Sequence, residues 1–550
     1  MPIVWLDGWI RPAYLPQAAH RGVRFTERRA MSKPELVRGL DTTYKVRLIF
    51  IDIVHELAYE GPCRFGQGEE LEPAFDKMIN NEAYKGICSA IEHNMPEGVE
   101  VLEPRRLMGH TENWCISEQQ MEAMCKGEED TDFYFFSTTG RTGEMIVELA
   151  QMLKKPCAFV GNDLGVTINA SAMLARGIEA YAFLSWEDAR KQLRILRARK
   201  VLAQTRVLCV SRFNGNISYH CSSDSFIDLE RVTRTLGTKF RFVNLHEFID
   251  QLQEIEPTEN YTTPGRVQEN INSEDRAEID AITEQLMESA QECEMDREML
   301  MRSVRVWWLE QKLMRKNECN AFTAVCPDAC STCRINKEKF TFCLGHSLNS
   351  EQGIPSACEY DIDAVVSMAA LEALANKPAY MGNTAVLTRP NGVRLNDGYV
   401  MHQNISDIGE ERWAQMEGVP NLIMTGHSVP NRQMKGFDAP QAPYAIRPFA
   451  YSGFGATMRY DYNLDKGQVV SMCRFGINCD KLFVARGTLW GGFGYELKNC
   501  THGAIIQVDN TDRFFAGQVQ AGNHIPFVYG DILDDLVALG KSFGLEVIVG

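Results

Sequence analysis

The sequence lacks any long apolar segment and is short of positive charge, and both shortages exclude classes of partner. A membrane-spanning helix needs ~20 consecutive apolar residues, and no window of the 550 residues approaches that pattern. Lysine and arginine number 57 against 73 for aspartate and glutamate, which gives a formal net charge of −16 at pH 7. Nucleic acids and anionic membrane surfaces carry charge of the same sign, so we expect neither as a partner.

We also expect no export signal, because Asp7, Trp9 and Pro12 interrupt any apolar segment in residues 1–20. The sequence contains 17 cysteines, and in a chain that is not exported these are reduced thiols rather than a disulfide framework. Most of them lie in apolar sequence, where a free cysteine packs as a small hydrophobic residue. The sequence therefore predicts a cytoplasmic protein.

Strand-like and helix-like segments alternate along the first two thirds of the chain. At 550 residues the chain is too long for one core, since a domain takes ~150 residues. The predicted strands are 45–56, 132–136, 156–160, 206–210 and 240–243, and the predicted helical segments are 144–153, 166–176, 186–199, 246–253 and 273–314. Alternation at this spacing is typical of α/β units with a parallel sheet.

The pattern changes after residue 350. One apolar helix is predicted over 364–375, and a last helix and strand are predicted over 531–540 and 546–549. Between them, Gly, Asn and Pro separate the short predicted strands 399–401, 469–475, 482–485 and 504–508. Short strands with frequent turns predict an antiparallel sheet or barrel. We therefore predict an α/β protein with two Rossmann-like domains, 1–203 and 204–355, followed by a β-rich domain, 356–550.

Carboxylates gather just before the helix predicted over 364–375. They are Glu359, Asp361 and Asp363, and a Gly-Asn-His turn that ends at His524 lies near the C-terminus. Carboxylate and imidazole are ligands of borderline divalent cations such as Mn²⁺. The pair predicts a metal-dependent enzyme that acts on an oxygen-rich small molecule. Acidic residues also favour helix N-termini, where they offset the helix dipole, so a capping role stays open for these aspartates.

Six short motifs support a resemblance that covers roughly residues 320–550. They are Ser-Leu-Asn (347–349), Gly-Ile-Pro (353–355), Ala-Cys-Glu-Tyr-Asp (357–361), Tyr-Val-Met-His (399–402), Gly-Asn-His (522–524) and Tyr-Gly-Asp (529–531). With them the C-terminal third resembles the L-fucose and L-arabinose isomerase superfamily, the fucose isomerase branch most closely. In that family a Glu, an Asp and a His bind one Mn²⁺. This ion chelates an open-chain sugar while carboxylates move a proton between C1 and C2 through an enediol. The family also implies a homo-oligomer, a hexamer.

The resemblance implies that Glu359 and His524 are metal ligands and that Glu359 and Asp361 transfer the proton. The family's aspartate falls at Asn383, which follows a strand predicted over 379–382. An amide oxygen can ligate a metal but cannot act as a base. Three alternatives stay open. The site binds metal more weakly with one base, Asp361 or Asp363 substitutes for the missing carboxylate, or the reaction is no longer isomerisation.

Three further residues are candidate substrate contacts. Asn523 precedes the predicted histidine ligand in the same turn. His402 follows a predicted strand and can donate to a sugar hydroxyl, although a core histidine bonded to a backbone carbonyl fits equally well. Trp490 stands among glycines and can stack on the C–H face of a sugar, with core packing as the alternative.

Cys326, Cys330 and Cys333 have the spacing of iron–sulfur sites that bind a radical-generating cofactor. A structural zinc site with Cys319 or Cys343 as the fourth ligand is a second alternative. The motif lies deep in the chain and does not follow the first strand of a barrel, so we expect loop and packing cysteines and no cluster.

Together these patterns predict a sugar isomerase of the fucose isomerase type, which acts through an enediolate on an open-chain sugar or a polyol-like substrate. A metal-dependent lyase or epimerase that uses the same charge stabilisation is the first alternative. A non-catalytic relative that binds sugar is the second.

Overall fold

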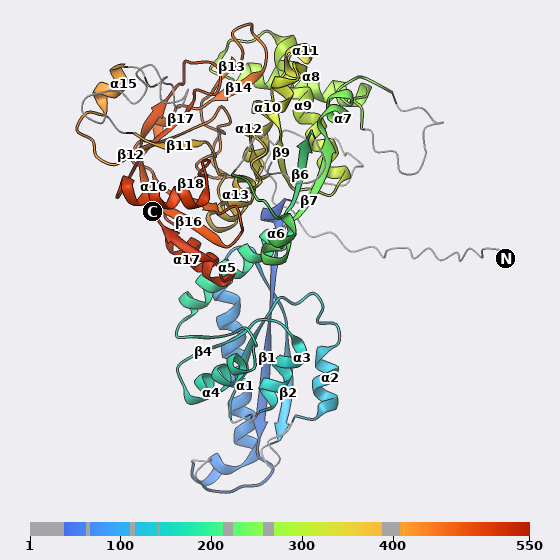
Figure 1. Ribbon diagram of the computed structural model, residues 1–550. Coiled ribbons are helices and arrows are strands. Elements are labelled where there is room, and N and C mark those ends of the chain that lie inside the picture. The colour runs from blue at the N-terminus through green and yellow to red at the C-terminus, as the bar shows by residue number, and fades with distance from the viewer. Residues whose placement is uncertain are drawn as a thin grey trace, which may run out of the picture. The chain divides into compact units, whose positions relative to one another are not determined.

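The computed structural model describes residues 38–61, 66–110, 116–140, 142, 144–212, 224–256, 269–387, 408 and 410–550. Two parallel sheets with Rossmann-like connections are followed by an antiparallel sheet (Figure 1). This order confirms the predicted fold class. The strand predicted over 399–401 and the candidate contact His402 lie outside the described residues.

The first sheet has five parallel strands in the order β2-β1-β3-β4-β5. They are β1 (Tyr44–Val54), β2 (Val99–His110), β3 (Phe133–Thr138), β4 (Cys157–Val160) and β5 (Ala180–Phe183), with helices α1 (Pro73–Asn94), α2 (Glu118–Cys125), α3 (Met145–Leu153), α4 (Leu164–Ala175) and α5 (Trp186–Gln204). Successive side chains of β1 alternate between two apolar clusters, with Ile49 and Ile51 in one and Leu48 and Phe50 in the other. A strand covered on both faces reads as a continuous apolar run, which is why β1 was predictable.

The second sheet is also parallel, in the order β10-β9-β6-β7. Its strands are β6 (Arg206–Ser211), β7 (Lys239–Asn244), β9 (Ala321–Ala324) and β10 (Ser356–Ala357). The helices are α6 (Leu229–Leu236), α7 (Leu245–Asp250), α8 (Ser273–Ser289), α9 (Arg297–Lys316), α10 (Cys326–Ser331), α11 (Arg334–Glu338) and α12 (Cys343–Glu351). The short strand β10 lies just past the domain boundary predicted at residue 355.

The helical segment predicted over 273–314 is two helices rather than one. The strand β8 (Glu292–Cys293) separates α8 from α9 and pairs in parallel with β13 (Ala445–Pro448). Asp296 then starts α9, because its side chain accepts a hydrogen bond of 3.0 Å from the backbone N–H of Met299. The interruption depends on a strand that lies 150 residues further along the chain, so helical periodicity alone could not reveal it.

The third sheet has the order β11-β12-β17-β16-β15-β18, and its neighbours along this path are antiparallel. Its strands are β11 (Asn383–Val386), β12 (Leu422–Gly426), β15 (Val469–Phe475), β16 (Lys481–Phe493), β17 (Gly503–Val508), β18 (Phe527–Tyr529) and β19 (Glu546–Val549), the last of which runs parallel to β16. The helices of this region are α13 (Ile362–Ala375), α15 (Glu410–Gln415), α16 (Thr511–Ala521) and α17 (Leu533–Ser542). A small sheet joins β8, β13 and β14 (Ala456–Arg459).

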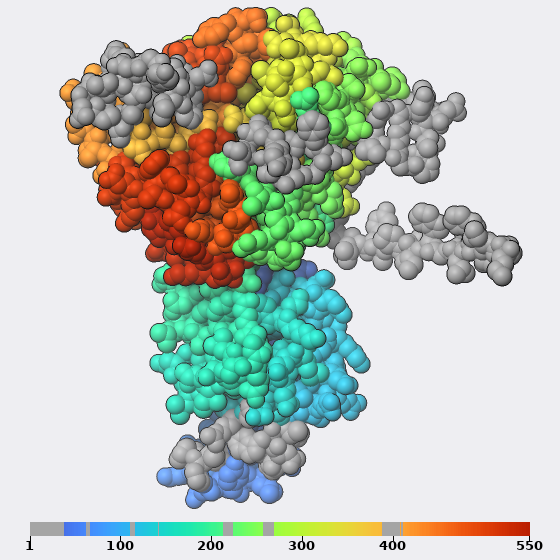
Figure 2. Space-filling model, in the orientation of Figure 1, coloured from blue at the N-terminus to red at the C-terminus, as the bar shows by residue number. Residues whose placement is uncertain are grey.

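Helix α13 is buried around its whole circumference and packs between the second and third sheets, against β9 and β10 on one side and β15 and β18 on the other. Figure 2 shows C-terminal segments (red) packed directly against surface segments from the part of the chain that forms the second sheet and its helices (green). The site described below lies where α13 begins. Among the described residues, no helix combines the length and apolar character needed to cross a membrane.

Candidate metal centre

Two neighbouring parallel strands end side by side at the start of the site. Ala357 at the end of β10 pairs with Thr323 near the end of β9, so the two carboxyl ends share one edge of the sheet, where α/β proteins bind ligands. The chain turns at once, because Glu359 and Tyr360 have φ angles of 59° and 61°. The left-handed region is costly for residues with side chains, and such strain gathers at functional sites.

Glu359, His427 and His524 form a candidate metal-binding triad, in which the ligand atoms all lie within 4.8 Å of one another. Oε1 of Glu359 lies 3.3 Å from Nε2 of His427, and its Oε2 lies 3.5 Å from Nε2 of His524. The carboxylate therefore stands between two imidazoles. The histidine side chains are 1% and 2% exposed, but that of Glu359 is 29% exposed. Glu359 is thus the member of the triad that solvent reaches most easily.

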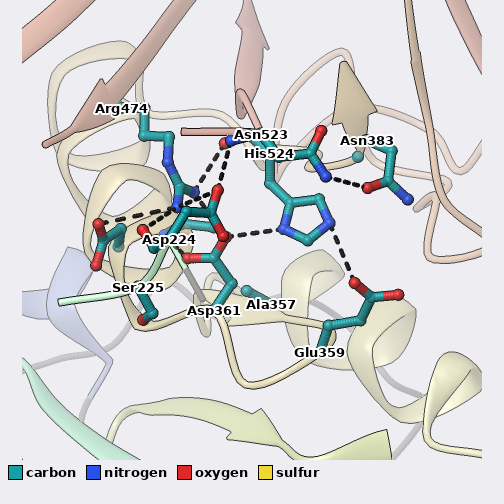
Figure 3. Close-up of polar contacts among 12 residues, drawn as sticks. Asp224, Ser225, Ala357, Glu359, Asp361, Asn383, Arg474, Asn523 and His524 are labelled. Atoms are coloured by element: carbon teal, nitrogen blue, oxygen red, sulfur yellow. Dashed lines mark hydrogen bonds and ion pairs between the residues drawn. The ribbon is translucent and has the colours of Figure 1, made fainter. Parts of the chain in front are cut away.

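Asp361 and Arg474 hold the ring of His524 in place (Figure 3). Oδ2 of Asp361 lies 2.8 Å from Nδ1 of His524 and also accepts a 2.7 Å hydrogen bond from Nη1 of Arg474. The same Nη1 donates to the backbone carbonyl of His524 over 2.9 Å. Figure 3 shows Asp361 on one side of the imidazole and Glu359 on the other. A carboxylate on one ring nitrogen that turns the other toward the site is the arrangement found behind metal-bound histidines.

Arg474 also gathers two further carboxylates. Its Nη2 lies 3.4 Å from Oδ2 of Asp224 and 3.8 Å from Oδ2 of Asp363, and the backbone N–H of Asn523 donates to Asp224 over 2.5 Å. A Cβ on Gly522, which has a φ of 127°, would lie 2.5 Å from Nε of Arg474, so only glycine fits there. One buried guanidinium therefore joins β15 to three distant segments, 224, 361–363 and 521–524, and it is stable there because it is paired and hydrogen-bonded.

The triad has the electrostatics of a cation site. Burial alone would raise the pKa of Glu359, but the hydrogen bond from His427 and the charges of both histidines outweigh it and lower this pKa to about 2. Burial would lower the pKa of His524, but Asp361 and Glu359 outweigh it and raise this pKa above its ordinary value. Burial would also raise the pKa of Asp361, which Arg474 and His524 instead hold well below its usual range. All three shifts mean that the site stabilises positive charge.

The hydrogen bonds around His524 fit a bound cation. When Asp361 accepts the proton on Nδ1, a neutral ring presents the lone pair of Nε2 to Oε2 of Glu359, 3.5 Å away. Among the described residues this Nε2 has no hydrogen-bond partner. Two acceptors that face each other repel, unless a cation lies between them or Nε2 carries a proton. Two imidazoles and one carboxylate also form a donor set that leaves coordination positions open for water or substrate.

The structure places Asn383 next to His524, because the two residues form an isolated antiparallel bridge. The side-chain oxygen of Asn383 accepts a hydrogen bond from Nδ2 of Asn523 (Figure 3). Oδ1 of Asn523 accepts one from the backbone N–H of Thr384 over 3.3 Å. Both ends of the Asn523 amide thus have partners within the chain. The metal role of Asn383 and the substrate role of Asn523 stay predictions.

Asp361 is fully buried, and besides the contacts to His524 and Arg474 its Oδ1 caps α13 by accepting from the backbone N–H of Ala364 over 2.9 Å. Asp361 therefore does cap the helix, as the alternative reading of the sequence suggested, but it also contacts His524 and Arg474. In this position Asp361 orients His524 from behind. Its predicted catalytic role stays untested.

Trp490 lies within β16 and packs against an apolar cluster that includes Trp413 and Phe493. The guanidinium of Arg412 and Nζ of Lys466 lie 5.0 and 4.8 Å from its ring centre, close enough for cation–π attraction. These contacts agree with the packing alternative. The substrate role of Trp490 stays a prediction.

Sequence reasoning missed His427, the second imidazole of the triad. It follows directly after β12, a strand that was not predicted. The backbone N–H of His427 donates to the hydroxyl of Tyr380 over 2.7 Å, and this hydroxyl donates to the carbonyl of His427 over 2.8 Å. The sequence pattern that could have revealed His427 is the apolar segment 422–424, which indicates a strand, followed by Gly426 and then a histidine, a common metal ligand.

The three cysteines of the predicted cluster motif have different surroundings. Sγ of Cys326 lies 3.4 Å from Sγ of Cys358, whereas Cys330 and Cys333 are exposed.

A scan against protein-family models and a comparison with curated proteins give no match to the chain.

Proposed function

We propose that the protein is a metal-dependent aldose–ketose isomerase of the fucose isomerase type, acting on an open-chain sugar or a related polyol. The triad of Glu359, His427 and His524, with Asp361 behind His524, is the observation that supports this proposal. The resemblance of the short C-terminal motifs to fucose isomerases suggests the class of reaction, aldose–ketose isomerisation. Mn²⁺ is the proposed ion, because one carboxylate with two imidazoles suits borderline divalent cations. The proposal includes the homo-oligomer that the resemblance implies.

Glu359, His427 and His524 would hold a divalent cation, and its chemistry there would be to supply positive charge against the negative charge that develops on a carbonyl oxygen. His427 and His524 hold their ring nitrogens toward that position, and Asp361 keeps the proton of His524 on Nδ1, away from the substrate. Glu359 is ionised at neutral pH and offers a charged oxygen ligand. Because a carboxylate with a pKa of about 2 is a poor proton acceptor at neutral pH, the ligand role suits Glu359 better than the base role.

The metal part of the proposal is tested by titrating chelator-treated protein with Mn²⁺ and, separately, with Zn²⁺. We expect one ion per chain in the wild type and loss of that ion in Glu359→Gln and His427→Ala. His93→Gln is the matched control, because His93 is exposed on α1 and, among the residues that the structure describes, bonds only within its own helix. Full metal occupancy in both triad variants would refute the site.

The reaction is tested by incubating the metal-loaded enzyme with aldoses, ketoses and uronates in deuterated water and following the products by NMR. An isomerase interconverts aldose and ketose and can exchange the transferred proton with solvent. A product with inverted configuration at one carbon would favour the epimerase alternative. A product that has lost water would favour the lyase alternative. Metal binding without any turnover would favour a sugar-binding relative.

A further inference from the structure

Two cysteines from neighbouring strands lie in contact beside the triad. Cys326 starts α10 two residues after β9, and Cys358 directly follows β10. Their Sγ atoms are 3.4 Å apart, so the ~2.0 Å length of a disulfide requires an approach of little more than ~1 Å. Cys326 is partly exposed, whereas Cys358 is only 2% exposed. The exposed cysteines of the same motif, Cys330 and Cys333, have no such sulfur contact among the described residues.

The backbone connects this sulfur pair to the candidate metal centre. Cys358 is bonded to Glu359, and the positive φ angles of Glu359 and Tyr360 leave this turn few alternative conformations. The backbone N–H of Tyr360 donates to the carbonyl of Ala324 over 3.0 Å, so β9 also holds the far side of the turn. Protein interiors transmit displacements because they are close-packed. A shift of Cys358 therefore moves Glu359 relative to the two histidines, which are carried by other elements.

We propose that Cys326 and Cys358 form a redox-active pair that a small-molecule disulfide converts to a protein disulfide, and that this bond weakens cation binding at Glu359. The formation of the bond is independent of the proposed function. Only its effect on the cation rests on that function.

The exchange has two steps, and Cys326 reacts first because it is the cysteine that a small disulfide can reach. The sulfur of Cys326 attacks one sulfur of the small disulfide, forms a mixed disulfide and releases one small thiol, which takes the proton of Cys326. The sulfur of Cys358 then attacks the sulfur of Cys326 and releases the second small thiol with the proton of Cys358. The two cysteines lose two electrons, and the small disulfide gains them.

The experiment uses the full chain and oxidised glutathione as the probe. Reduced protein is equilibrated with mixtures of oxidised and reduced glutathione, its free thiols are alkylated, and peptides are mapped by mass spectrometry without reduction. We expect a linked pair of peptides containing Cys326 and Cys358, two hydrogens lighter than their sum, whose fraction rises with the oxidised share and disappears on adding dithiothreitol. Cys326→Ser should abolish the link, and the matched control Cys330→Ser should keep it.

The effect on the cation is measured by titrating oxidised and reduced wild type with Mn²⁺. We expect binding ~10-fold weaker after oxidation, the scale of disturbances next to a metal ligand, and no effect of the oxidant on Cys326→Ser. Absence of the linked peptides, or a bond from Cys326 to Cys330 or Cys333, overturns the proposal. Equal affinity in both forms, with the link demonstrated, overturns its second half. Reduced protein that binds neither Mn²⁺ nor Zn²⁺ refutes the proposed function, while the peptide map still decides the disulfide.

Discussion

The two ends of α13 carry buried carboxyl groups in opposite electrostatic surroundings. At the N-terminal end, Arg474 and His524 outweigh the burial of Asp361 and hold its pKa well below the usual range. Near the C-terminal end, burial raises the pKa of Glu372 to about 8, which a hydrogen bond from the backbone N–H of Ala379 offsets only in part. Both carboxyl groups are buried, so burial does not explain why their pKa values move in opposite directions. The guanidinium of Arg474, which lies beside Asp361 and not beside Glu372, explains the difference.

Asp363 sharpens this comparison, because it lies at the same end as Asp361 and near the same guanidinium. Burial raises the pKa of Asp363 well above its usual value in spite of Arg474. Beside the same guanidinium, the pKa is therefore lowered only for the aspartate that also contacts His524. The negative charge is concentrated where it orients the candidate ligand.

Removing the guanidinium of Arg474 should give the carboxyl groups at the two ends of α13 similar electrostatic surroundings. We predict that Arg474→Met destabilises the fold by about 3–5 kcal/mol, because it leaves buried carboxylates without a partner. Urea unfolding measures this change. The matched control is Arg486→Met, whose ion pair with Asp531 has side chains that are 47% and 51% exposed and should contribute less than about 1 kcal/mol. Equal losses in the two variants would show that the buried cation has no special role.

Neutralising only the aspartate should separate orientation from folding. We predict that Asp361→Asn weakens Mn²⁺ binding by ~10–100-fold, because His524 loses the carboxylate that orients it. Asparagine also caps helices well, so the start of α13 should survive. Calorimetric titration measures the affinity and thermal unfolding checks the fold. Glu372→Gln is the control at the other end of the helix and should bind Mn²⁺ as the wild type does.

The raised pKa of Glu372 predicts a pH dependence of stability between pH 7 and pH 8 that the lowered pKa of Asp361 does not produce. In the folded state the group keeps its proton up to pH values near 8, while the unfolded chain loses it near pH ~4.3. The folded state thus binds more protons within this window, so stability falls as pH rises through it. Between pH 7 and pH 8, wild type should lose about 1 kcal/mol relative to Glu372→Gln. Parallel stability curves for the two proteins would place the ionisation of Glu372 elsewhere.

Asn383 tests whether a further charge can be added to the site. We predict that Asn383→Asp tightens Mn²⁺ binding several-fold, because a charged oxygen ligand attracts the cation more strongly than an amide oxygen. Isomerase activity should be kept or raised if isomerisation is the natural reaction. Unchanged affinity would mean that position 383 does not ligate the ion.

The sequence predicted those parts of the fold that follow from local pattern. The apolar run of β1, the helix α13 and the strands β15 and β17 appear close to their predicted positions. The break between α8 and α9 escaped prediction, because it depends on pairing with β13. Parallel and antiparallel regions were distinguished correctly because helices separate the strands of the first two sheets, whereas β15, β16 and β17 follow one another without a helix between them.

The candidate site was predicted only in part. Glu359 and His524 were singled out by their short motifs, and the structure brings them together with Asp361. His427 and Arg474 were missed, because neither belongs to a motif and each reaches the site only when distant segments pack. An arginine in an apolar strand such as β15 is the local signal that could have revealed Arg474, since a buried charge needs partners.

Anomalous diffraction from a crystal of the Mn²⁺-loaded protein tests the metal centre most directly. We expect one anomalous peak between Glu359, His427 and His524, about 2.0–2.4 Å from an oxygen of the carboxylate and from one nitrogen of each ring. A manganese peak elsewhere in the chain, or a fully loaded crystal in which these three side chains contact no ion, would contradict the assignment of this site.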